Sequence, residues 1–154
     1  MTYKFEEQNY LPLSIHNTKA TFYSFRQGNL SKSDYFQRFK NYTDIATSFD
    51  GNLHDEAITR MVYIKDWSHE DISALSDDGK EEIDDMASKR YLSIAFVQQS
   101  DKQRYGKLTE ELENGFTNRN ANYLRDVTKS YQLLNDNDAQ HHLCHLAACV
   151  RYED

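Results

Sequence analysis

Residues 31–49 read SKSDYFQRFKNYTDIATSF, and their apolar side chains recur at intervals of three and four. That spacing places them along one side of an α-helix, and it is the strongest amphipathic pattern in the chain. Ser31 and Asp34 stand three residues apart, as in a capping box at a helix start. Gly51 follows where helices commonly end. The side chains predicted to face inward are Tyr35, Phe36, Phe39, Tyr42, Ile45, Ala46 and Phe49.

Helical periodicity continues on both sides of this stretch, and the sequence contains no run of strand-like alternation. One Pro and five Gly in 154 residues demand few turns, which also favours long helices. We therefore predict an all-α fold with six to seven helices in two packed lobes. The lobes are residues 1–75 and 80–135, and residues 136–154 form a tail with helical spacing, whose end we expect to fray.

The predicted elements follow from caps and breaks along the chain. They are an irregular arm over 1–10, helices over 12–26 and 55–65, a short helix around Ile72 and Leu75, a loop over 76–79, a long helix over 80–99, a helix capped by Ser100 and Asp101 that stops at Gly115, a helix over 121–135, a polar break over 135–138, and a final helix over 139–152. Four of these helices have predicted apolar faces. These are Leu11, Ile15, Phe22 and Phe25; then Ile83, Met86, Ala87, Tyr91, Ile94, Ala95 and Val97; then Tyr105, Leu108 and Leu112; then Leu124, Val127, Tyr131 and Leu134.

Composition narrows the classes of function. The net charge is −7 at pH 7, and no Lys/Arg cluster forms a basic patch, so this stretch is not expected to bind nucleic acid itself. No apolar run is long enough for a membrane span, and no signal peptide is visible at the start. Cys144 and Cys149 do not form a disulfide framework. We expect a cytoplasmic protein with reduced thiols and no membrane partner.

The sequence contains no recognised catalytic or cofactor-binding motif, including the Gly-rich, P-loop, zinc-protease and nucleophile-elbow signatures. We therefore expect neither catalytic nor cofactor-binding residues, and we do not expect an enzyme. One cluster invites a metal hypothesis: His141, His145 and Cys149 would share one side of a helix. Zinc prefers four ligands, and the fourth would have to come from elsewhere. We favour an amphipathic tail and predict no metal site.

Two further residues have alternative interpretations. Gly106 lies inside a predicted helix, where glycine costs about 1 kcal/mol relative to alanine. We favour close helix packing there over a ligand contact. Trp67 precedes a predicted cap, and we interpret it as a core or staple residue rather than a partner-binding one.

The block over residues 90–135 reads RYLSIAFVQQSDKQRYGKLTEELENGFTNRNANYLRDVTKSYQLLN. Together with SDYFQRFK at 33–40 and the entry segment at 3–13, it resembles the Gag-like capsid region of copia-type LTR retrotransposons, especially the diatom-type group. Two departures stand out: Leu124 replaces a common proline, and the usual zinc knuckle does not follow residue 134. The family-motif residues are Tyr35, Arg38, Phe39, Arg104, Tyr105, Gly106, Leu112, Glu113, Asn114 and Tyr131.

The resemblance implies a retroelement capsid-like fold and a structural role without catalysis. The chain would then bind copies of itself as a homo-oligomer and package element RNA, with the RNA held by a downstream nucleocapsid region. The alternative is a domesticated helical protein–protein interaction module, which would bind one defined partner and form no polymer.

Overall fold

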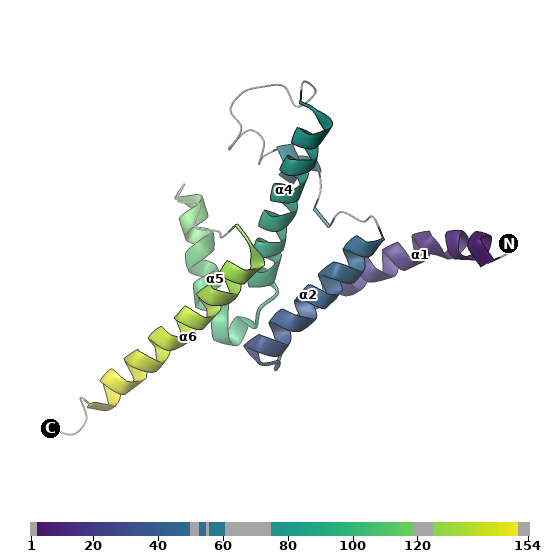
Figure 1. Ribbon diagram of the computed structural model, residues 1–154. Coiled ribbons are helices and arrows are strands. Elements are labelled where there is room, and N and C mark those ends of the chain that lie inside the picture. The colour runs from purple at the N-terminus through teal and green to yellow at the C-terminus, as the bar shows by residue number, and fades with distance from the viewer. Residues whose placement is uncertain (1–2, 50–52, 55, 61–74, 119–124, 151–154) are drawn as a thin grey trace.

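The computed structural model describes residues 3–49, 53–54, 56–60, 75–118 and 125–150, and the side chains of α1 from Tyr10 onward (Figure 1). Within these ranges the chain is helical and contains no strand, which confirms the all-α prediction. Residues 56–60 are helical, in agreement with the helix predicted over 55–65, whose remainder lies outside the described residues. The long helices are α1 (Tyr3–Ser24), α2 (Lys32–Ser48), α4 (Asp77–Gln98), α5 (Lys102–Thr117) and α6 (Val127–Val150).

Helix α2 forms as its sequence predicts. The Ser31 hydroxyl caps it by accepting a hydrogen bond from the backbone N–H of Asp34, which pairs one of the free donors at the helix start. Tyr35, Phe39 and Ala46 are buried. Ile45 does not face inward as predicted, because its side chain is 49% exposed. The helix ends at Ser48, and Gly51 lies outside the described residues.

Helix α1 corrects two predictions. It begins at Tyr3, so the irregular arm over 1–10 is wrong, and Pro12 lies inside the helix rather than in its first turn. Proline removes one backbone donor. Pro12 itself is exposed, so its ring lies at the surface of the helix. Of the predicted inward side chains, Phe22 is buried, whereas Leu11 is 41% exposed.

Helix α4 starts earlier than predicted. Ser76 caps it by accepting a hydrogen bond from the Gly79 N–H, so residues 77–79 form its first turn rather than a loop. Two acidic residues in that turn favour this start, since they complement the positive end of the helix dipole. Ile94 is 37% exposed, contrary to prediction, and Phe96 is fully buried although periodicity did not select it.

The last two helices extend beyond their predicted ends. Helix α5 reaches Thr117 instead of stopping at Gly115, and its predicted inward residues Tyr105, Leu108 and Leu112 are all buried. Helix α6 runs unbroken through 135–138, so the predicted polar break is wrong. Asn and Asp lower helix propensity by less than about 1 kcal/mol each. Here Asp138 also forms tertiary contacts that favour the helix.

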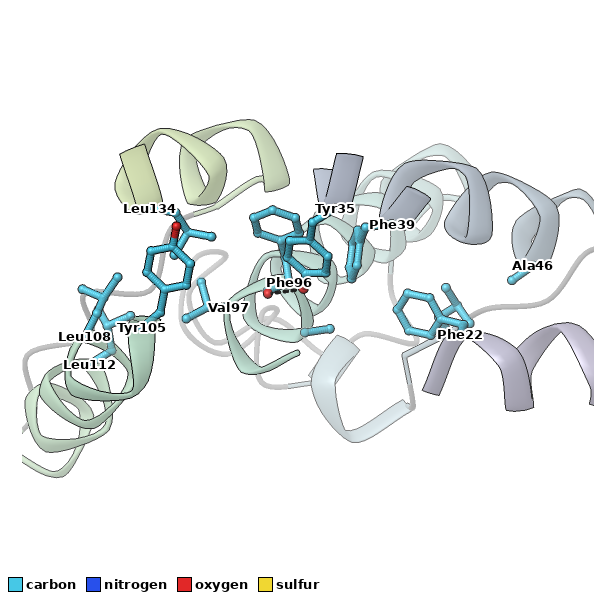
Figure 2. Close-up of a cluster of buried hydrophobic side chains, with 12 residues drawn as sticks. Phe22, Tyr35, Phe39, Ala46, Phe96, Val97, Tyr105, Leu108, Leu112 and Leu134 are labelled. Atoms are coloured by element: carbon cyan, nitrogen blue, oxygen red, sulfur yellow. Dashed lines mark hydrogen bonds between the residues drawn. The ribbon is translucent and has the colours of Figure 1, made fainter. Parts of the chain in front are cut away.

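The core is one cluster of buried apolar side chains from all five helices (Figure 2). Its centre is aromatic: the Phe96 ring stacks on Tyr35 at 4.6 Å between centroids and meets Phe39 edge-on at 5.1 Å. Phe22 of α1 packs on Phe39 at 5.4 Å. The cluster therefore joins residues from both predicted lobes, and the lobe boundary at 76–79 stays a prediction.

Candidate functional site: the junction between the α1–α2 loop and the α4–α5 turn

The loop after α1 is hydrogen-bonded to the turn between α4 and α5. The Gln27 N–H donates to the Gln99 carbonyl at 3.0 Å, and the Asp101 N–H donates to Oε1 of Gln27 at 2.9 Å. The Gln27 side chain also donates to the carbonyl of Leu30 at 3.3 Å. Gln27 is only 1% exposed, so each of these bonds satisfies a polar group that water does not reach.

Gln99 makes the reciprocal connection. Its Nε2 donates to the carbonyl of Phe22 at 3.3 Å, which ties the turn to the end of α1. Its Oε1 is buried and has no hydrogen-bond partner in the described part of the chain. Neither glutamine has a signature in a single sequence, because glutamine is usually exposed and nothing in the local pattern predicts that it is buried. Sequence reasoning therefore missed both.

Arg104, a family-motif residue, lies at the surface of this junction and binds both of its segments. One guanidinium nitrogen, Nη2, donates to the carbonyls of Gly28 and Leu30 at 2.9 and 2.8 Å. Its Nε donates to Asp101 at 2.8 Å. This hydrogen bond from Arg104 is the main reason why the pKa of Asp101 lies below its usual value. Gly28 has a φ of 52°, the left-handed region that glycine adopts without strain, which directs the loop towards Arg104.

Tyr105, the next motif residue, is fully buried and links three helices. Its hydroxyl donates to Oδ2 of Asp138 on α6 at 3.1 Å. The same carboxylate oxygen forms an ion pair with Nζ of Lys32 on α2 at 2.7 Å. Burial, followed by the hydrogen bond to Asp138, raises the pKa of the Tyr105 phenol well above its usual range. A neutral Tyr105 is therefore the stable form in this site.

The aromatic motif residues form contacts between α2 and its neighbours. The Tyr35 hydroxyl donates to the carbonyl of Phe96 at 2.6 Å, and burial raises the pKa of this phenol strongly. Tyr131 of α6 stacks on Phe36 of α2 at 4.6 Å. Phe39 belongs to the aromatic core described above, and Leu112 of α5 is buried in the same cluster.

The remaining motif residues lie at or near the surface. Arg38 and Asn114 are exposed, and Glu113 accepts a hydrogen bond from the Gln98 side chain at 3.1 Å. The packing explanation for Gly106 is wrong: a Cβ atom at this position would meet no atom of the described residues within 4 Å. The structure gives no physical account of glycine there.

Two polar pairs were not predicted. The Ser93 and Ser130 hydroxyls meet at 2.7 Å in the buried contact between α4 and α6. His54 Nε2 lies 2.8 Å from a carboxylate oxygen of Asp84, and its Nδ1 is buried without a hydrogen-bond partner among the described residues. Ser and His occur on many helix surfaces, so a single sequence does not show which of them meet.

The metal hypothesis falls largely outside the described side chains. His141, His145 and Cys149 lie on α6, whose backbone is helical there, but their side chains are not described. Elsewhere in the described ranges, no group of three or more His, Cys, Asp or Glu side chains is placed to hold a metal ion. None of the described helices has the length and apolar composition needed to cross a bilayer. Trp67 lies outside the described residues.

The class of protein that these observations define is an all-helical domain, in which some of the motif residues, such as Tyr35 and Tyr105, join its helices. Comparison with protein-family models, curated proteins and solved structures finds no significant match. The arrangement at the junction holds hydrogen bonds and ion pairs within the fold. The Tyr35 and Tyr105 hydroxyls bond to neighbouring helices, and Nη2 of Arg104 bonds to the loop between α1 and α2.

Proposed function

We propose that this protein is a structural, Gag-like capsid protein of a retrotransposon, which associates with copies of itself and has no catalytic activity. The observation that carries this proposal is the use of the motif residues. Arg104, Tyr105 and Tyr35 direct their polar groups to backbone carbonyls and to Asp138 inside the fold. Catalytic side chains need a reacting atom within reach of a free donor, acceptor or nucleophile. In this protein the hydroxyls of Tyr35 and Tyr105 and the guanidinium of Arg104 instead form hydrogen bonds that stabilise the fold.

The charge of the chain supports the idea that different segments bind RNA and form the contacts between subunits. A net charge of −7 repels a phosphate backbone, so RNA would be held by a separate basic segment rather than by this helical body. The helical body would supply contacts between subunits. Such contacts must be weak and reversible if subunits are to add and rearrange before a shell closes. We place this assembly in the cytoplasm, where Cys144 and Cys149 would stay reduced.

The test is the molar mass of the purified protein, measured by light scattering after size exclusion over a range of concentrations and salt. The proposal predicts a mass that rises with concentration above the monomer value of 18.1 kDa, and particles or ordered oligomers by electron microscopy. A monomer at every concentration, with no particles, would overturn it. That result would favour the alternative, a helical interaction module with a different partner.

A further inference from the structure

Large apolar side chains are exposed mainly on α1. Tyr10 is 65% exposed, Leu13 54% and Leu11 41%, within four consecutive positions of one helix. The other large exposed apolar side chains in the described part of the chain are isolated by comparison: Tyr23, Ile45 and Ile94. Single exposed apolar residues are ordinary, whereas a cluster of them marks an interaction surface.

The geometry of α1 shows that this cluster is not the outer side of a normal amphipathic helix. Successive residues turn by about 100°, so Tyr10 and Leu13 are neighbours on one side and Leu11 lies on another. A helix that is apolar on more than one side is typically covered by protein on more than one side. In Figure 1, the N-terminal part of α1 extends past the end of α2 and is not covered by the other labelled helices.

The distribution of charge indicates which partner binds this exposed part of α1. Residues 8–18 read QNYLPLSIHNT and contain no Asp, Glu, Lys or Arg. Over its whole length α1 is balanced, with Lys4 and Lys19 against Glu6 and Glu7. The chain as a whole has a net charge of −7, so two copies repel each other over most of their surfaces. The neutral segment of α1 is a place where two copies can meet without that repulsion.

We propose that the α1 apolar face, defined as Tyr10 and Leu13, docks against the same face of a second copy of this chain. This inference rests on the proposed function and locates the self-association surface that it requires. Contact of a face with itself is two-fold symmetric and closes at a dimer. A shell would need a second, different contact between such dimers.

The size of the face predicts a weak dimer. An aromatic side chain buries at most about 250 Å². The area that these two side chains can bury therefore falls well below the roughly 800 Å² per partner of a standard stable interface. The dimer should dissociate on dilution, as reversible assembly requires.

The experiment compares wild type with Leu13→Glu and Ile94→Glu by light scattering at matched concentrations. Both variants add one negative charge at an exposed aliphatic position of a helix, and glutamate is a good helix former. We expect Leu13→Glu to weaken dimerisation by about tenfold or more, since like charges would face each other across the contact. Ile94→Glu should dimerise as wild type does. Far-UV circular dichroism and thermal melting verify that each variant folds, and Tyr10→Gln serves as a second test if Leu13→Glu does not.

Each outcome is decisive. Loss of dimer in Leu13→Glu or Tyr10→Gln, with dimer retained in Ile94→Glu, supports the α1 face. If wild type associates and all three variants associate equally, the contact lies elsewhere, and this inference fails while the proposed function stands. If Ile94→Glu blocks association as strongly as Leu13→Glu, the effect is one of net charge and the α1 assignment fails. If wild type is a monomer at all concentrations, the proposed function fails first.

Discussion

The hydroxyl of Tyr35 donates a 2.6 Å hydrogen bond to the backbone carbonyl of Phe96, and the rings of the same two residues stack at 4.6 Å (Figure 2). One side chain therefore joins α2 to α4 through a polar and an apolar contact together. Both residues are fully buried, so the hydroxyl has no water to replace its partner. Tyr35 and Phe96 are 61 residues apart in the chain, and local sequence patterns do not predict that they meet.

Removing only the Tyr35 hydroxyl should destabilise the fold. Tyr35→Phe keeps the ring stack and leaves the Phe96 carbonyl without this donor. The expected loss is about 1 kcal/mol in the free energy of unfolding, measured by urea denaturation. Tyr10→Phe is the matched control, because Tyr10 is 65% exposed and should change stability little. Equal stability of Tyr35→Phe and wild type would contradict the described bond.

Stability should fall at alkaline pH. The pKa values of Tyr35 and Tyr105 are raised in the fold, mainly by burial, whereas an unfolded tyrosine titrates near pH 10. Above about pH 10 the unfolded state therefore releases these protons first and is favoured, while below that pH their contribution is constant. Each phenol contributes a limiting slope of about 1.4 kcal/mol per pH unit. The double variant Tyr35→Phe, Tyr105→Phe should be less stable at neutral pH but lose less stability as the pH rises. An identical alkaline slope would refute this assignment.

Two glycines should respond oppositely to alanine. Gly106 is helical with open space around it, so Gly106→Ala should raise the free energy of unfolding by about 0.5–1 kcal/mol. Gly28 also has open space, but its φ is 52°, so Gly28→Ala should lower that free energy by about 1 kcal/mol through backbone strain. Thermal or urea unfolding measures both. A destabilising Gly106→Ala would mean that something contacts this position in solution.

The two motif arginines should differ in importance. Arg104→Lys loses the arrangement that contacts Gly28, Leu30 and Asp101, and we expect a loss of about 1 kcal/mol, reduced by the partial exposure of the side chain. Arg38→Lys is the control at an exposed position and should stay within about 0.5 kcal/mol of wild type. Both are measured by urea unfolding. The reverse order would show that the junction contributes little to stability.

The sequence predicted that the helices exist more accurately than it predicted the residues at which they begin and end. The apolar spacing and the Ser31 cap correctly located α2, because both signals are local. Exposure to solvent and contacts with other helices also affect where α1 and α4 begin and why α6 is continuous. Pro12 lies at an exposed position inside α1, and the Asp138 position is stabilised by Lys32 and Tyr105 from other helices. Tertiary contacts of this kind override weak local preferences.

The junction was predicted only in part. The resemblance selected Arg104, which binds the α1–α2 loop, and Tyr105, which joins α5 to α6. It gave no indication of Gln27 or Gln99, whose roles arise only when the α1–α2 loop meets the α4–α5 turn. Periodicity likewise selected Ile94 over Phe96, whereas contact with Tyr35 and Phe39 of α2 buries Phe96, and a single sequence does not show that contact.

We propose that this helical body binds copies of itself. Sedimentation velocity of the wild-type protein, from low micromolar to near-millimolar concentration, measures that association. We expect a boundary that shifts from the 18.1 kDa monomer towards larger species as concentration rises. A single monomeric species across the whole range would contradict it.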